Sequence, residues 1–231
     1  MEAIKTMKRY EIKYILSREQ ISYLISALQG HMEVDQYGKT SIASIYFDTP
    51  DDRLIRTSIE KPAFKEKIRA RSYGLAKTNQ PVFLELKRKA DGIVYKRRVQ
   101  IKEEDLPSFF ESAQKVDRND QIGKEILYFK TYYHNLRPKI LIIYDRVAYF
   151  QKDSDLRLTI DENPRYRLKD LNLHTSLDGE PLLADGGGIL EIKVQDAMPL
   201  WLTSILSAGK IYRGSFSKVG EAYKKCLMQY A

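Results

Sequence analysis

The sequence predicts an α+β fold: an eight-stranded antiparallel β-barrel that forms a tunnel with a charged interior, with helices packed on the outside. Short segments alternate charged and apolar residues, as in KIRARSYG, where Lys67, Arg69 and Arg71 are two positions apart. Eight segments of this kind occur along the chain, and five others have apolar residues at helical spacing. Because residues i and i+2 share one face of a strand, each of the eight has a polar face and an apolar face.

The predicted strands have this alternation one after another along the chain. In the first, Glu11 and Lys13 alternate with Tyr10, Ile12 and Tyr14. The eight predicted strands are, in order, 9–14, 44–48, 67–71, 82–89, 94–101, 140–150, 156–161 and 189–194. Eight strands closed into a barrel leave an interior wide enough for side chains or one slender ligand, and they leave no open edge.

The predicted helices decide which strand face points inward. Ser17, with Gln20 three residues later, is typical of a capping box, and Ile21, Leu24 and Leu28 follow as an apolar stripe. The five predicted helices lie in 17–29, 103–114, 123–136, 199–209 and 218–230. Helices of this kind need an apolar surface to cover. We therefore expect the apolar strand faces to lie under the helices and the charged faces to line the tunnel.

A charged interior favours a phosphate-rich ligand. Two like charges about 5 Å apart repel each other by roughly 3 kcal/mol at an effective dielectric of about 20. Glu11, Glu85 and Glu191 offset part of this repulsion, but the cations on the predicted strands outnumber the carboxylates. Arginine side chains match the geometry of phosphate especially well, so a phosphate chain is the ligand we expect.

Composition sets the remaining bounds. The 231 residues, 43% of them hydrophobic, suit a single domain spanning 1–231, with a long loop expected over 165–188. The net charge of +8 favours anionic partners in general. Cys226 is the single cysteine, the three histidines lack metal spacing, and no GxxxxGK(S/T) phosphate loop occurs. No run approaches 18 apolar residues, so we expect a cytoplasmic chain without a membrane segment.

Nine short motifs resemble those of a known family. In chain order they are RYEIKY, SIYFDTPD, KIRARSYG, VFLELKRK, YKRR, YDRVAYF, LRLTIDE, LEIKV and SFSK. From about Arg9 to Lys218 the chain resembles the polyphosphate polymerase domain of the vacuolar transporter chaperone (VTC) family. That family belongs to the CYTH-like triphosphate tunnel metalloenzymes. The resemblance implies the charged tunnel that the strand pattern predicts.

The resemblance also implies a set of site residues. Family members bind nucleotide triphosphate and polyphosphate through residues that correspond here to Lys13, Arg56, Arg69, Arg71, Lys87, Lys96, Tyr144, Arg146, Arg157, Ser217 and Lys218. The metal-binding glutamate of the family falls on Glu191, which would hold Mn²⁺ or Mg²⁺ against phosphate oxygens. Glu11 and Glu85 are expected to support the metal or the neighbouring lysines.

The implied reaction is transfer of the γ-phosphoryl group of ATP to a growing polyphosphate chain, with release of ADP. Such transfer depends mainly on positioning and on charge neutralisation, which lysines and arginines in a dry tunnel supply. Two other classes stay open: a metal-dependent hydrolase of triphosphate or polyphosphate, and a polyphosphate-binding module without catalysis. ATP and polyphosphate are the expected partners. Nucleic acid is not expected, because charges inside a narrow tunnel cannot reach a duplex.

Two motifs depart from the family pattern. The superfamily often begins with a paired-glutamate ExExK motif, but Arg9 stands here at the first glutamate, which matches the polymerase branch better than the triphosphatase and cyclase branch. A metal site with one carboxylate is expected to be weaker. The last motif of the polymerase branch usually begins with lysine, whereas Ser215 stands here, with Arg213 two residues earlier.

Overall fold

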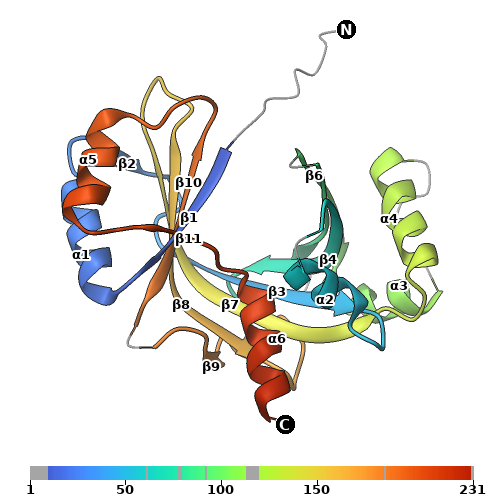
Figure 1. Ribbon diagram of the computed structural model, residues 1–231. Coiled ribbons are helices and arrows are strands. Elements are labelled where there is room, and N and C mark those ends of the chain that lie inside the picture. Colours follow the sequence, from blue (N-terminus) through green and yellow to red (C-terminus); the bar gives the residue numbers. More distant parts are fainter. Residues whose placement is uncertain are drawn as a thin grey trace, which may run out of the picture. The chain divides into compact units, whose positions relative to one another are not determined.

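The computed structural model describes residues 10–60, 62–77, 80–91, 93–112, 120–184 and 186–229, so Arg9 lies outside the described residues. They form a mixed α+β fold with one large antiparallel sheet and six α-helices (Figure 1). The helices are α1 (Arg18–Ala27), α2 (Arg53–Glu60), α3 (Leu106–Ser112), α4 (Gln121–Tyr132), α5 (Leu200–Ala208) and α6 (Lys218–Gln229). The strands are β1 (Tyr10–Leu16), β2 (Glu33–Val34), β3 (Thr40–Asp48), β4 (Phe64–Tyr73), β5 (Pro81–Ala90), β6 (Ile93–Lys102), β7 (Arg137–Phe150), β8 (Arg157–Arg167), β9 (Glu180–Pro181), β10 (Gly188–Val194) and β11 (Arg213–Gly214).

The eight predicted strands are all present, as β1, β3 to β8 and β10. Three short strands, β2, β9 and β11, were not predicted. The strand order is β11-β1-β10-β8-β7-β3-β4-β5-β6, with β2 paired to β7 and β9 to β8. Within the described ranges this order has two ends, at β11 and β6, so closure into an eight-stranded barrel is not confirmed.

The chain divides into two compact units. Unit 1 comprises Met1–Thr40, Tyr144–Pro164 and Leu183–Phe216, and unit 2 comprises Ser41–Ile143, Arg165–Leu182 and Ser217–Ala231. The long strands β7 and β8 contribute residues to both units. Each unit has its own buried apolar cluster.

In unit 1 the helices α1 and α5 lie against one face of the strands (Figure 1). Leu24 of α1 and Leu202 of α5 belong to the same buried cluster as Leu158, Leu190 and Ile192 of the strands. Ser17 begins α1 with the predicted capping box: its hydroxyl accepts from the backbone N–H of Gln20, whose side chain accepts from the Ser17 N–H. The apolar strand face of unit 1 therefore lies under helices, as predicted.

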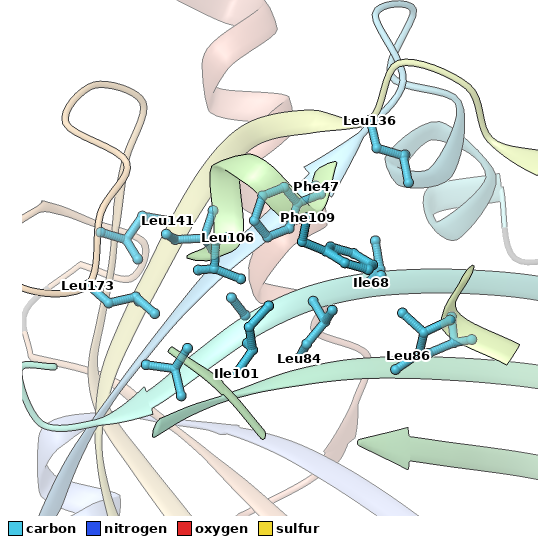
Figure 2. Close-up of a cluster of buried hydrophobic side chains, with 14 of the residues drawn as sticks. Phe47, Ile68, Leu84, Leu86, Ile101, Leu106, Phe109, Leu136, Leu141 and Leu173 are labelled. Carbon is cyan, nitrogen blue, oxygen red and sulfur yellow. The ribbon is translucent and has the colours of Figure 1, made fainter. Parts of the chain in front are cut away.

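Unit 2 has the same layering, and Figure 2 shows its buried cluster. Ile68 of β4 and Leu84 and Leu86 of β5 pack with Phe109 of α3 and Phe47 of β3. The alternate residues of these strands are the charged ones, and they occupy the opposite face. The prediction that the apolar strand faces lie under helices is thus confirmed within each unit by itself, whereas the lining of a tunnel by the charged faces stays a prediction.

Helix α2 was missed by the sequence analysis, and its start depends on a buried carboxylate. The side chain of Asp48 accepts hydrogen bonds from the backbone N–H groups of Leu54 and Ile55, each at 2.8 Å. Such caps satisfy N–H groups that have no partner inside a helix. The predicted loop over 165–188 is shorter, because β8 continues to Arg167 and β10 begins at Gly188. Among the residues described, no helix is long and apolar enough to cross a membrane.

Candidate functional site

The strand face of unit 2 opposite its buried apolar cluster carries a concentration of positive charge, which we call the basic face. It is formed by side chains of β4, β5 and β6 that share one parity, namely Lys65, Lys67, Arg69, Arg71, Lys87, Lys89, Lys96 and Arg98. Tyr46 of β3 lies opposite Arg69 and shares this face. Within the described residues of β4, β5 and β6, Glu85 is the one carboxylate on this face.

Glu85 is the centre of an ion-pair cluster on the basic face. Its side chain is 1% exposed. Its carboxylate lies 2.8 Å from the Arg69 guanidinium, 3.6 Å from that of Arg71 and 2.7 Å from the Lys96 ammonium. One buried negative charge therefore holds three cations on adjacent strands.

The charges of this cluster shift one another's pKa values. Burial alone raises the pKa of Glu85, but Arg69, Arg71 and Lys96 outweigh burial and bring it to about 2. The pKa of Lys96 falls below its ordinary value, chiefly because of burial and further because of the two arginines, against the opposing effect of Glu85. Three cations against one carboxylate leave a surplus of positive charge, which an anion can neutralise.

Tyr46 belongs to the same cluster, although the sequence analysis did not include it in the site. Its hydroxyl accepts a hydrogen bond of 2.8 Å from Arg69, whose guanidinium also binds Glu85. Burial raises the pKa of Tyr46, but Arg69, Lys67 and Arg71 overcome that effect and lower the pKa to about 7. Arg69 is thereby held on two sides, by a phenol and by a carboxylate.

A row of lysines lies beside this cluster. Lys67, Lys87 and Lys96 stand directly opposite one another on β4, β5 and β6. Like charges in direct opposition across strands destabilise a sheet. No ion pair of Lys87 occurs among the residues that the structure describes, so its charge is open to an anionic ligand.

The remaining predicted residues of unit 2 lie on helices. Arg56 of α2 is exposed, and its guanidinium lies 3.5 Å from the carboxylate of Asp51. Ser217 begins α6: its carbonyl accepts from the Glu221 N–H at 2.8 Å and its hydroxyl from the Gly220 N–H at 3.3 Å. Lys218 is the first residue of that helix. Helices α2 and α6 contact each other.

The strand face of unit 1 opposite its helices has cations and carboxylates together, and we call it the mixed-charge face. It contains Glu11, Lys13, Tyr144, Arg146, Arg157, Thr159, Asp161 and Glu191. Lys13 stands opposite Glu191, and its ammonium lies 3.0 Å from the Glu191 carboxylate and 3.6 Å from that of Glu11. That Glu11 supports the metal or a neighbouring lysine stays a prediction.

Arg146 is bound to two carboxylates. Its guanidinium makes two hydrogen bonds to Asp161, at 2.5 and 2.8 Å, and lies 3.9 Å from Glu191. It also lies over the ring of Tyr144, 5.1 Å from the ring centre. Burial lowers the pKa of Arg146, but Tyr144, Asp161 and Glu191 together hold it above its ordinary value. The bidentate pair fixes the Arg146 guanidinium in one orientation.

Two cations near this face have other partners. The guanidinium of Arg157 donates to the carbonyl oxygens of Ser154 and Leu156, each at 2.9 Å. Arg213 stands opposite Tyr14, whereas Gly214 stands opposite Lys13. Tyr14 belongs to the apolar cluster of unit 1, so the register places Arg213 beside that cluster rather than beside Lys13.

A divalent cation fits the mixed-charge face only if it takes most of its ligands from phosphate and water. No group of three or more His, Cys, Asp or Glu side chains in the described ranges is arranged to hold a metal ion. Glu191 supplies one carboxylate, and the buried Thr159 hydroxyl opposite it has no hydrogen-bond partner there. Mg²⁺ is commonly bound by one or two carboxylates together with substrate phosphates and water. The donors present fit this kind of site.

The predicted residues therefore fall into two groups. Arg69, Arg71 and Lys96 meet at Glu85 in unit 2, and Lys13 and Arg146 meet at Glu191 in unit 1. The sequence analysis left Tyr46, Asp161 and Thr159 out of the site. Asp161 and Thr159 have the strand parity of Arg157, which is the signal that would have found them. Strand β3 carries no predicted site residue, and only the register places Tyr46 beside Arg69.

Comparison with protein families identifies this chain. The sequence profile described as the VTC domain matches residues 8–227. The chain belongs to the VTC domain family. The family resemblance of the nine motifs is thereby confirmed. A search of curated proteins gives no significant match to this VTC domain.

Solved structures share the fold of the VTC domain. A candidate adenylate cyclase from Bacillus halodurans aligns with a TM-score of 0.56 at 15% identity, over 91% of this chain and 94% of the other. A candidate adenylyl cyclase from Hippeastrum, described as having a dominant triphosphatase activity, aligns with a TM-score of 0.55 at 17% identity, over 92% and 93%. At these identities the likeness shows the fold alone. Together with the family match, it supports membership of the triphosphate tunnel superfamily.

Proposed function

We propose that this VTC domain is an ATP-dependent polyphosphate polymerase that transfers the γ-phosphoryl group of ATP to a growing polyphosphate chain. The observation that carries the proposal is the basic face, where cations of three adjacent strands surround one buried carboxylate. A phosphate chain carries negative charge at regular short intervals, and such a ligand matches a surface on which cations recur from strand to strand. Family membership supports the same ligand class.

The basic face is suited to bind and to orient phosphate groups. Arg69 and Arg71 have planar guanidinium groups, which bind phosphate oxygens in pairs. Because Glu85 and Tyr46 fix the Arg69 side chain beforehand, little conformational entropy is lost when a phosphate binds. Lys87 and Lys96 add charge along the neighbouring strands. Phosphoryl transfer has a loose transition state, so prepositioned cations of this kind stabilise it without further rearrangement.

The mixed-charge face supplies the groups for a metal, Mn²⁺ or Mg²⁺. Bound there, such a cation would supply positive charge that neutralises phosphate groups. Glu191 is the carboxylate that would hold it, and Lys13 and Arg146 hold the Glu191 side chain in place. Asp161 orients Arg146 rather than the phosphates. Weaker metal binding by a site with one carboxylate stays a prediction.

Closure of the strands into an eight-stranded tunnel belongs to this proposal, as does a cytoplasmic location. A tunnel would keep water away from the reacting phosphates and hold donor and acceptor in line. The second candidate is a metal-dependent triphosphate or polyphosphate hydrolase, in which water replaces the acceptor chain. The triphosphatase activity described for the Hippeastrum protein supports the hydrolase as the second candidate. A binding module without catalysis is the third.

One incubation separates these candidates. Purified protein is mixed with γ-labelled ATP, Mn²⁺ and a short polyphosphate primer, and the products are separated by length on a gel. The proposal predicts label in chains longer than the primer. Label found only in orthophosphate would establish the hydrolase, and unchanged ATP with tight primer binding would establish the binding module.

A further inference from the structure

The hydroxyl of Thr159 is buried and has no partner. The residue is 9% exposed, and its Oγ1 makes no hydrogen bond within the described part of the chain. Buried hydroxyl groups in folded proteins are nearly always hydrogen bonded, because an unpaired one loses its hydration without compensation. The Thr159 hydroxyl therefore calls for a partner that the described residues do not supply.

Thr159 stands in line with two residues of the mixed-charge face. On adjacent strands, Lys13 of β1 lies opposite Glu191 of β10, and Glu191 lies opposite Thr159 of β8. The β-carbons of residues directly opposite each other in an antiparallel pair are about 4.5–5.5 Å apart. Lys13 approaches Glu191 from one side, at 3.0 Å. Thr159 is on the strand that pairs with the other edge of β10.

The neighbours of Thr159 favour a cation over an anion. Glu191 lies opposite it, and Asp161 and Arg157 lie two residues away on the same strand, so two carboxylates and one guanidinium share its face. The Arg157 guanidinium is bonded to the backbone carbonyls of Ser154 and Leu156. Asp161 is already bound by Arg146 through two hydrogen bonds. A phosphate oxygen close to Glu191 would meet electrostatic repulsion, whereas a water molecule bound to a cation can donate a hydrogen bond to a hydroxyl oxygen. Divalent cations in phosphate sites usually retain several waters.

We propose that Thr159 is the second protein oxygen of the cation site, and that its hydroxyl accepts a hydrogen bond from a water bound to the divalent cation at Glu191. This inference rests on the proposed function, because it concerns the same cation site. Thr159 is a positioning residue here, since it acts through a water. Groups of this kind orient the ligands of a metal and typically change its affinity 10- to 100-fold when they are removed.

The test is direct titration of Mn²⁺ into the protein without nucleotide, with free Mn²⁺ measured by electron paramagnetic resonance. Thr159→Val keeps the shape and the strand preference but removes the hydroxyl, so we expect Mn²⁺ affinity to fall about 10- to 100-fold. Thr159→Ser keeps the hydroxyl and should retain the affinity. Without metal, Thr159→Val should raise the melting temperature by about 2–4 °C, because the unpaired buried hydroxyl is gone.

The other possible results of this titration refute either the role of Thr159 or the cation site itself. Unchanged Mn²⁺ affinity in Thr159→Val, with affinity lost in Glu191→Gln, would refute the role of Thr159 and leave the proposed function standing. Unchanged affinity in both variants would refute the cation site itself, and with it the metal part of the proposed function. If Thr159→Val binds Mn²⁺ normally but binds polyphosphate more weakly in EDTA, the hydroxyl contacts phosphate instead.

Discussion

The polar faces of the two units differ in how their charges are balanced. On the mixed-charge face of unit 1, Lys13 has two carboxylates within 4 Å, those of Glu11 and Glu191, and Arg146 has Asp161 and Glu191. On the basic face of unit 2, the single carboxylate of Glu85 forms ion pairs with Arg69, Arg71 and Lys96. The first face is close to neutral by itself, and the second needs added negative charge.

This difference indicates two separate tasks. A face whose charges are already matched gains little from a bare anion, but it can accept a phosphate that arrives with a metal ion. A face with surplus cations binds an anion without help, and it does so most strongly where the cations are held rigidly. Phosphate binding by unit 2 should therefore be independent of metal, and unit 1 should make the reaction metal-dependent.

The largest difference between the faces should appear when their central carboxylates are neutralised. Glu85→Gln leaves three cations without a buried counter-charge, so we expect the free energy of unfolding to fall by about 3–5 kcal/mol in urea denaturation. The matched variant Glu191→Gln should lose less, since Lys13 keeps Glu11 and Arg146 keeps Asp161. An equal or larger loss in Glu191→Gln would contradict the comparison.

A lysine of the basic face should matter for binding rather than for folding. Lys87→Gln is expected to weaken polyphosphate binding about tenfold or more, while the empty protein keeps or gains stability, because Lys67 and Lys96 stand opposite Lys87. Isothermal titration calorimetry and thermal unfolding measure the two quantities. Lys102→Gln is the control: that lysine is exposed and pairs with Glu104 at 3.4 Å, so binding should not change. A marked loss of stability in Lys87→Gln would show that the residue is structural.

A further effect that we predict is a pH dependence of stability caused by Tyr46. Its pKa is lowered to about 7 in the folded protein and returns to its ordinary value near 10 on unfolding. Between these pH values the unfolded chain binds the additional proton, so Tyr46 contributes stability that increases as pH rises from 7 to 10 and is lost as pH falls through 7. Urea denaturation across this range should show the increase in the wild type and less of it in Tyr46→Phe.

The control for this pH dependence is a tyrosine of unit 1. Tyr14→Phe should follow the wild type below pH 10, because burial raises the pKa of Tyr14 despite the nearby Arg213. Parallel stability curves for the wild type and Tyr46→Phe would mean that Tyr46 does not ionise on the basic face.

Much of the fold could be predicted from the sequence because alternation within a strand is a local signal. The parity of Arg69 and Glu85 against Ile68 and Leu84 was sufficient to assign both the strands and their faces. Helix α2 was missed because it depends on Asp48, a cap whose partners lie six and seven residues further along the chain. Strand order and closure depend on contacts far apart in sequence, which no local pattern encodes.

The candidate site was predicted less completely, for a related reason. Arg69 and Lys13 were found through charge and motif, whereas Tyr46 and Thr159 are uncharged and acquire their importance from cross-strand neighbours. Arg157 was expected to bind phosphate, and that remains a prediction, although its guanidinium bonds to backbone carbonyls in this structure. Only the register reveals which side chains face one another.

The most direct test of the division between the two faces is polyphosphate binding in EDTA and in Mn²⁺ by the wild type, Lys87→Gln and Glu191→Gln. We predict that Lys87→Gln weakens binding in both solutions. Glu191→Gln should keep wild-type affinity in EDTA and lose only the part that Mn²⁺ adds. Full affinity of Lys87→Gln in EDTA, or an equal loss in Glu191→Gln there, would contradict the account.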